Sequence, residues 1–166
     1  MTDQDDEKRR LATLHGYGVL DTPNEPEFDA IVREAAALMG TPTALISLVD
    51  EHRQWFKARV GLDATETPRS ISFCTHAIRG KDVFVVEDAA RDERFADNPL
   101  VTGYPNIRFY AGAPLRSSKG HRVGTLCVID DKPRAEPTEA EKAKLAELAD
   151  RTIAAFERRR DADRAA

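Results

Sequence analysis

The fold of this chain is decided by residues 107–130, which read IRFYAGAPLRSSKGHRVGTLCVID. Two apolar runs, 107–116 and 122–129, flank the short polar segment 117–120, which ends in a glycine. The apolar runs are rich in β-branched and aromatic residues, and a short glycine-containing connection is typical of a β-hairpin. The stretch therefore predicts two neighbouring antiparallel strands.

Three shorter apolar runs upstream predict further strands of the same sheet. We expect them at 44–49, 54–60 and 83–86, with the first two joined as a hairpin. A loop at 62–70 and a short helix at 73–78 should separate the second strand from the third.

The segment 88–104 is expected to be a long connection, because it is rich in turn-forming residues. Long loops inside compact domains are usually functional.

Three segments have helical patterns. Residues 5–14 are polar and helix-forming, and 26–39 carry apolar residues at three- and four-residue steps before Gly40. A last helix should start at Pro137, and its narrow apolar stripe is typical of a coiled coil or bundle. We expect a homodimer through the terminal helices, with Leu145, Leu148, Thr152 and Phe156 at or near the contact.

The order of these elements predicts an α+β fold with a mainly antiparallel sheet. The 166 residues suffice for one domain. We divide it into an N-terminal helix at 1–17, a core at 18–131 and a C-terminal helix at 132–166 that belongs to the same domain.

Composition excludes several classes of function. The net charge of −4, with the only dense basic run at 158–160 among acidic residues, argues against a nucleic-acid partner. No apolar run is long enough to span a bilayer, and the N-terminus lacks the apolar stretch of a signal peptide. We therefore expect a cytoplasmic protein without membrane contact, in which the two cysteines, Cys74 and Cys127, are reduced.

Seven short segments together carry a recognisable pattern: LDTP (20–23), SLVD (47–50), QWFK (54–57), SFCTH (72–76), RFADNP (94–99), IRFYAGAPL (107–115) and GTLCVID (124–130). They resemble the GAF family, specifically the bacterial signalling subgroup that precedes histidine kinases and diguanylate cyclases. The resemblance implies a central sheet of five to six strands in the order 2-1-5-4-3. It also implies terminal helices on one face and a ligand pocket, covered by loops and a short helix, on the other.

In that architecture the segments 72–79 and 88–104 cover the pocket, and the strands contribute alternate side chains. The candidate ligand-binding residues are Trp55, Lys57, Phe73, Cys74, His76, Asp88, Phe95, Arg108 and Tyr110. The two cations, Lys57 and Arg108, favour an anionic ligand, and the aromatic residues would form apolar walls.

Four of these candidates also have a purely structural interpretation. Trp55 and Phe73 would serve as core residues, and the two cations would neutralise Glu87, Asp88 or Asp97 at the base of the loop.

Cys74 and His76 raise the hypothesis of a reactive thiolate. Residues two apart on a helix point in different directions, however, so activation of Cys74 by His76 would require an irregular backbone. Cys74, His76 and Cys127 lack the paired spacing of a zinc site, so we expect no metal.

Motifs of common enzyme classes are absent from the sequence. Free methionine sulfoxide reductases resemble this fold but use a cysteine just before the fourth strand, where this chain reads YPNI (104–107).

The sequence thus predicts a sensory GAF domain rather than an enzyme. It would bind a small molecule whose identity stays open, as does any cofactor, and signal through its terminal helices to an output protein such as a histidine kinase of a two-component system or a diguanylate cyclase. Two alternatives stay open: a redox sensor or methionine-sulfoxide-reductase-like enzyme using Cys74, and a dimerisation scaffold with a vestigial pocket.

Overall fold

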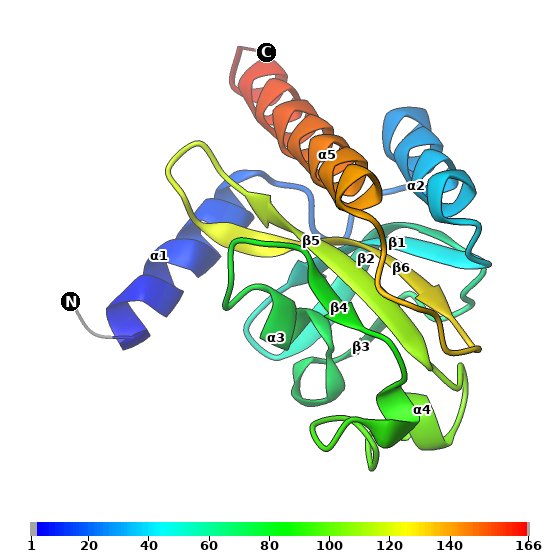
Figure 1. Cartoon of the computed structure of the whole chain (residues 1–166). Coiled ribbons are helices and arrows are strands. Elements are labelled where there is room, and N and C mark those ends of the chain that lie inside the picture. Colours follow the sequence, from blue (N-terminus) through cyan, green and yellow to red (C-terminus); the bar gives the residue numbers. More distant parts are fainter. Residues whose placement is uncertain (1–2, 166) are drawn as a thin grey trace.

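Six antiparallel strands form one sheet at the centre of the molecule, described here from a computed structural model that covers residues 3–165 (Figure 1). The strands are β1 (Thr43–Val49), β2 (Arg53–Val60), β3 (Glu66–Pro68), β4 (Phe84–Val86), β5 (Phe109–Arg116) and β6 (Arg122–Asp130). The α-helices are α1 (Asp3–Gly16), α2 (Pro26–Met39), α3 (Cys74–Ala77), α4 (Pro99–Thr102) and α5 (Glu139–Ala165), with 3-10 turns at Arg69–Ile71 and Ala89–Arg91.

The strand order is β3-β2-β1-β6-β5-β4. Without the edge strand β3, this is the order that the family resemblance implies. Strand β3 itself lies in the segment 62–70, for which we expected only a loop, so that expectation was wrong. Its three residues pair with the start of β2, where Gln54 faces Thr67.

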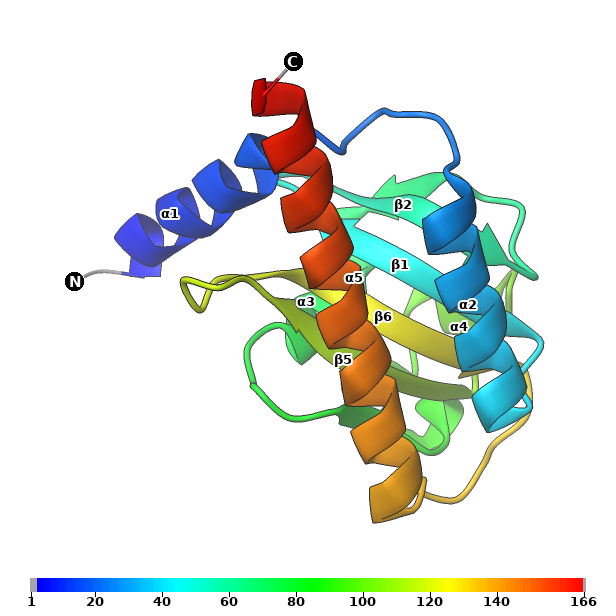
Figure 2. The same ribbon diagram turned by 90° about the horizontal axis from the view of Figure 1, so that it is seen from above.

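Helices α2 and α5 lie side by side across one face of the sheet (Figure 2). Pro26 occupies the first turn of α2, and Gly40 ends the helix in a left-handed conformation at φ 66°. The rings of Phe28 in α2 and Phe156 in α5 are 5.0 Å apart, and both side chains are buried. The main apolar core therefore lies between these two helices and the sheet.

This packing corrects the expected dimer contact. Leu145, Leu148, Thr152 and Phe156 are all buried within the single chain, three of them in that core. The narrow stripe of α5 faces its own sheet and cannot also meet a second copy.

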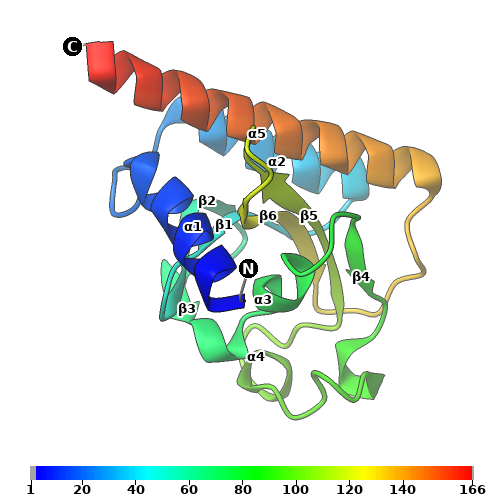
Figure 3. The same ribbon diagram turned by 90° about the vertical axis from the view of Figure 1, so that its left-hand side faces the viewer.

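Helix α1 lies outside the layer formed by α2 and α5, which differs from the expectation that all terminal helices share one face (Figure 3). The buried Arg10 of α1 donates from Nη1 to the carbonyl of Val49, at 2.7 Å. Helix α1 is thereby attached to the end of β1.

The opposite face of the sheet carries α3, α4 and the loops around them (Figure 3). A second apolar core lies beneath this cover, built from residues such as Phe73, Phe95 and Tyr110.

Candidate functional site

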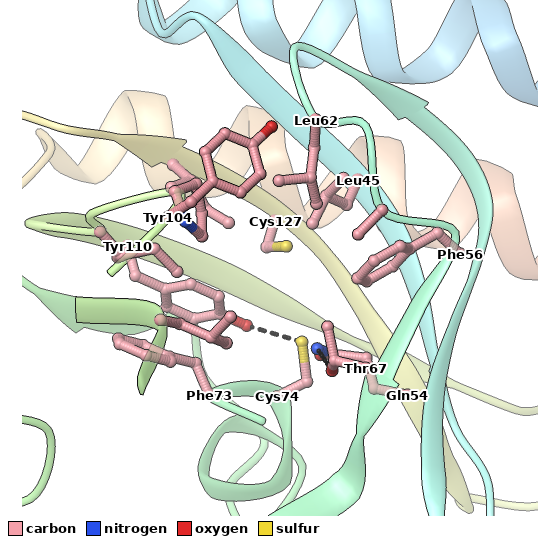
Figure 4. Close-up of a pocket in the computed structure, with 15 residues that line it drawn as sticks. Leu45, Gln54, Phe56, Leu62, Thr67, Phe73, Cys74, Tyr104, Tyr110 and Cys127 are labelled. Carbon is pink, nitrogen blue, oxygen red and sulfur yellow. Dashed lines mark hydrogen bonds between the residues drawn. The ribbon is translucent and has the colours of Figure 1, made fainter. Parts of the chain in front are cut away.

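A cavity of about 60 Å³ lies between the sheet and the cover formed by α3 and α4 (Figure 4). The strands contribute Leu45, Gln54, Phe56, Thr67, Tyr110, Cys127 and Ile129 to its wall. The cover and loops contribute Leu62, Ala64, Phe73, Cys74, Leu100, Tyr104, Pro105 and Ile107. Such a volume holds several water molecules or a very small ligand, whereas typical ligand pockets are several times larger.

Aromatic rings hold the cover in place beside the cavity. Phe73 and Phe95 stack with their ring centres 4.1 Å apart, and Phe73 also contacts the Tyr110 ring at 5.3 Å. All three side chains are buried. The cover is therefore packed against β5 by aromatic contacts.

The Cys74 sulfur is the chemically most distinctive group in the wall. Its Sγ lies 3.2 Å from the Tyr110 hydroxyl and 3.0 Å from Thr125 Oγ1, and Figure 4 shows the first contact. Gly112 makes this arrangement possible, because a Cβ at that position would lie only 2.9 Å from two carbons of the Tyr110 ring and closer still to its hydroxyl. The phenol crosses β5 over this glycine and so reaches the thiol.

Burial controls ionisation in this cluster. It raises the pKa of the Tyr110 phenol and of the Cys127 thiol well above their ordinary values, because a charge there would lose its hydration. Burial also opposes ionisation of Cys74, but polar neighbours, among them the hydrogen-bonded hydroxyls of Tyr110 and Thr125, lower the pKa of that thiol. Cys74 is therefore the more acidic thiol of the two.

A second buried polar network, which our sequence analysis missed, lies beside the cavity. Gln54 Oε1 accepts hydrogen bonds from the hydroxyls of Ser47 and Ser72, each at 2.9 Å. Its Nε2 donates to Thr67 Oγ1 at 2.8 Å and so ties β3 to β2. The sequence feature that could have predicted this network is the presence of polar residues, such as Ser47 and Gln54, at inward positions of apolar strands.

Three of the nine candidate residues, Phe73, Cys74 and Tyr110, line the cavity. Phe95 stacks behind Phe73 and does not line it. His76 contacts the rings of Phe95 and Phe84 at 4.8 and 6.4 Å. Burial lowers the pKa of His76, which favours the neutral ring.

Trp55 and Lys57 were misplaced by the sequence analysis, because they lie on the helix face of the sheet, away from the cavity. Trp55 belongs to the core beneath α2 and α5. Lys57 Nζ donates to Thr22 Oγ1 and to the carbonyl of Pro23, both at 2.7 Å, and pairs with Glu25.

Arg108 and Asp88 also lie outside the cavity wall. Arg108 donates to the carbonyls of Val101 and Ile107, at 2.9 and 3.0 Å, and so supports the end of α4. Asp88 caps the turn that follows it by accepting from the Ala90 amide at 3.2 Å. The expected cationic clamp for an anion is therefore wrong: no charged side chain lines the cavity within residues 3–165.

No group of three or more histidine, cysteine, aspartate or glutamate side chains in residues 3–165 is placed to hold a metal ion. Over the same residues, none of the helices combines the length and the apolar character needed to traverse a lipid bilayer.

Comparison with known proteins agrees with this architecture. The chain is 48% identical over 145 residues to a cyclic di-GMP phosphodiesterase of Pseudomonas aeruginosa, covering 87% of this chain and 25% of the relative. This chain thus spans about a quarter of the length of that curated relative.

Solved structures of low sequence identity share the fold. A GAF domain from a Coxiella burnetii phosphoenolpyruvate-protein phosphotransferase superposes with a TM-score of 0.68 at 16% identity, covering 99% of this chain and 100% of that one. A GAF domain of the corresponding Acinetobacter protein gives a TM-score of 0.67 at 20% identity, covering 95% of both chains. The model of the GAF domain family matches residues 24–156, and this chain belongs to that family.

Proposed function

We propose that this chain is a sensory module of a bacterial signalling protein, regulatory rather than catalytic, that binds a small uncharged molecule in the cavity at Cys74. The observation that carries the proposal is the character of the cavity wall, which is mainly aromatic, aliphatic and sulfur-containing and has no charged side chain among the described residues 3–165. Such a wall favours an apolar ligand with few polar groups.

A mechanical path from the cavity to α5 supports a signalling role. Phe56 lines the cavity, and its neighbour Lys57 is buried on the other face, where it pairs with Glu25. Glu25 in turn accepts from Arg159 Nε of α5 at 3.0 Å. A displacement of β2 by a ligand would therefore change a contact of the C-terminal helix.

The output lies in a separate segment or partner in this proposal. The similar Pseudomonas protein is much longer than this chain and is named a cyclic di-GMP phosphodiesterase, so we propose an output in cyclic di-GMP signalling. A cytoplasmic location and assembly as a homodimer stay predictions, and the dimer contact would have to use surfaces other than the buried stripe of α5.

A thermal-shift screen with small neutral molecules and small carboxylates tests the ligand class. Ala64→Phe should plug the cavity, because Ala64 is part of its wall, and Ala135→Phe on an exposed loop is the matched control. We expect neutral molecules to raise the melting temperature of the parent and of Ala135→Phe but not of Ala64→Phe. A shift caused by carboxylates alone, or one that survives in Ala64→Phe, would contradict the proposal.

A further inference from the structure

Two thiols from distant parts of the sequence line the same cavity. Cys74 lies at the start of α3 and Cys127 in the middle of β6, and their side chains are 1% and 0% exposed. Thr125 and Cys127 are two residues apart on one strand, so both face the cavity side of the sheet. Because Cys74 Sγ lies 3.0 Å from Thr125 Oγ1, it stands over the part of β6 that carries Cys127, and both cysteines line the cavity. Figure 4 shows both sulfur atoms directed into the cavity.

We propose that Cys74 and Cys127 form a redox-active dithiol, which hydrogen peroxide converts into an intramolecular disulfide inside the cavity. This modification site is independent of the ligand proposed above, since it requires only the two sulfur atoms and a small oxidant.

The reaction balances with hydrogen peroxide as the oxidant. The Cys74 thiolate attacks one peroxide oxygen, the S–O bond forms as the O–O bond breaks, and the departing hydroxide takes up a proton to give water. The Cys127 sulfur then attacks the Cys74 sulfenic acid, the S–S bond forms and the S–O bond breaks, and a second water leaves with the Cys127 proton. Two thiols lose two electrons, and one peroxide is reduced to two waters.

The surroundings assign the first step to Cys74. Hydroxyl groups of Tyr110 and Thr125 lie next to its sulfur and can donate hydrogen bonds to a thiolate. These donors compensate in part for the absence of water around the buried charge. Cys127, which lines the same cavity, serves as the resolving thiol.

Cavity size selects the oxidant. A volume of about 60 Å³ admits hydrogen peroxide, which is little larger than water, but excludes a bulky disulfide such as oxidised glutathione. Tyr104, 60% exposed, belongs to the wall where the cavity approaches the surface.

Disulfide formation would also change the cavity itself. The two sulfur atoms must approach to about 2 Å, which draws Cys74 Sγ away from the Tyr110 and Thr125 hydroxyls. The disulfide would thus link α3 covalently to β6 and break the hydrogen bonds of Cys74 with Tyr110 and Thr125.

The test uses the reduced full chain and a few equivalents of hydrogen peroxide, with catalase added before denaturation in an alkylating agent. We expect a mass loss of about 2 Da, protection of both cysteines from alkylation and a peptide that joins Cys74 to Cys127, all reversed by dithiothreitol. Disulfide formation should be at least about tenfold faster in the folded chain than in urea, because the fold holds the two thiols together.

Variants define the roles of the two thiols. Cys127→Ala should leave a sulfenic acid on Cys74 that dimedone traps, whereas Cys74→Ala should leave Cys127 reduced under the same conditions. Circular dichroism checks that each variant is folded, and the experiment on the parent chain does not depend on them. Two alkylatable cysteines after excess peroxide, a disulfide that joins only two separate chains, or equal rates in buffer and urea would overturn the proposal.

Discussion

Phe56 and Lys57 are neighbours on β2, but Phe56 lines the cavity while Lys57 is buried on the opposite face of the sheet. A β-bulge occurs at this point: Ile46 of β1 pairs with Ala58 and Ser47 pairs with Phe56, which leaves Lys57 without a partner in the ladder. Bulges redirect side chains, and here the extra residue places a cation beneath the helix layer. The fully enclosed cation Lys57 therefore directly follows the cavity residue Phe56 in the chain.

Replacing Lys57 by methionine should destabilise the domain. Methionine fills the space of the side-chain stem but removes the donors to Thr22 and Pro23 and the ion pair with Glu25. We expect a loss of about 2–4 kcal/mol in the free energy of unfolding. The contact of Glu25 with Arg159 limits this loss, because the carboxylate keeps one cationic partner. Urea unfolding measures it, with the exposed Lys119→Met as control. Equal midpoints for the two variants would show that the buried cation contributes nothing.

Gly112→Ala should disturb the surroundings of Cys74 by displacing Tyr110. The new methyl group would overlap the Tyr110 phenol, which must then move away from Cys74. Crowding of a packed core usually costs about 1–3 kcal/mol, and the displaced phenol should also slow the reaction of Cys74 with peroxide. Gly80→Ala is the matched control, because nothing lies within 4 Å of its added methyl group. A peroxide reaction as fast in Gly112→Ala as in Gly80→Ala would contradict the assigned role of Tyr110.

Sequence alone predicted the central strands because their apolar character is continuous. Strand β6 is buried along nearly its whole length, so the run at 122–129 carries the signal at almost every position. Strand β3 gave no such signal, since its residues Glu66 and Pro68 are exposed and only pairing with β2 makes it a strand. A strand defined by its partner cannot be recognised from its own three residues.

The site was predicted less well than the fold, for a geometric reason. Because side chains alternate along a strand, Phe56 and Lys57 are expected on opposite faces of the sheet, but this pattern does not predict which face carries the helices. We assigned Trp55 and Lys57 to the cavity side, and the structure places them on the other. Arg108 comes one residue before β5, where its side chain turns back toward α4 and leaves the alternating pattern.

Arg108→Ala should lower stability slightly and leave ligand binding unchanged. The guanidinium donates to the Val101 and Ile107 carbonyls and does not line the cavity. Loss of these hydrogen bonds from a half-buried group should cost about 1–2 kcal/mol. Melting curves with and without a ligand found by screening measure both effects. A ligand-induced shift that disappears in this variant would return Arg108 to the binding site.

Glu7 should make the attachment of α1 dependent on pH. Its carboxylate accepts from Arg10 Nε at 2.8 Å and from Arg69 Nη1 at 2.6 Å. The hydrogen bond from Arg10, opposed by burial and assisted by Arg69, lowers the pKa of Glu7 to about 2. The ion pair of Glu7 with Arg69 thus joins α1 to the 3-10 turn Arg69–Ile71, which precedes α3.

The sign of the pH effect follows from this lowered pKa. Because Glu7 binds its proton more weakly in the folded chain, its contribution to stability is complete above pH 4.5 and is lost as the pH falls from 4.5 toward 2. Its side chain is 35% exposed, so solvent screening limits the contribution to about 1 kcal/mol. Glu7→Gln should therefore unfold at lower urea concentration than the parent at pH 7, and the difference should shrink at pH 3. Glu93→Gln, which removes an exposed carboxylate without touching Arg10 or Arg69, controls for net charge. A difference between parent and Glu7→Gln that stays constant from pH 7 to pH 3 would mean that ionisation of Glu7 does not stabilise the contact.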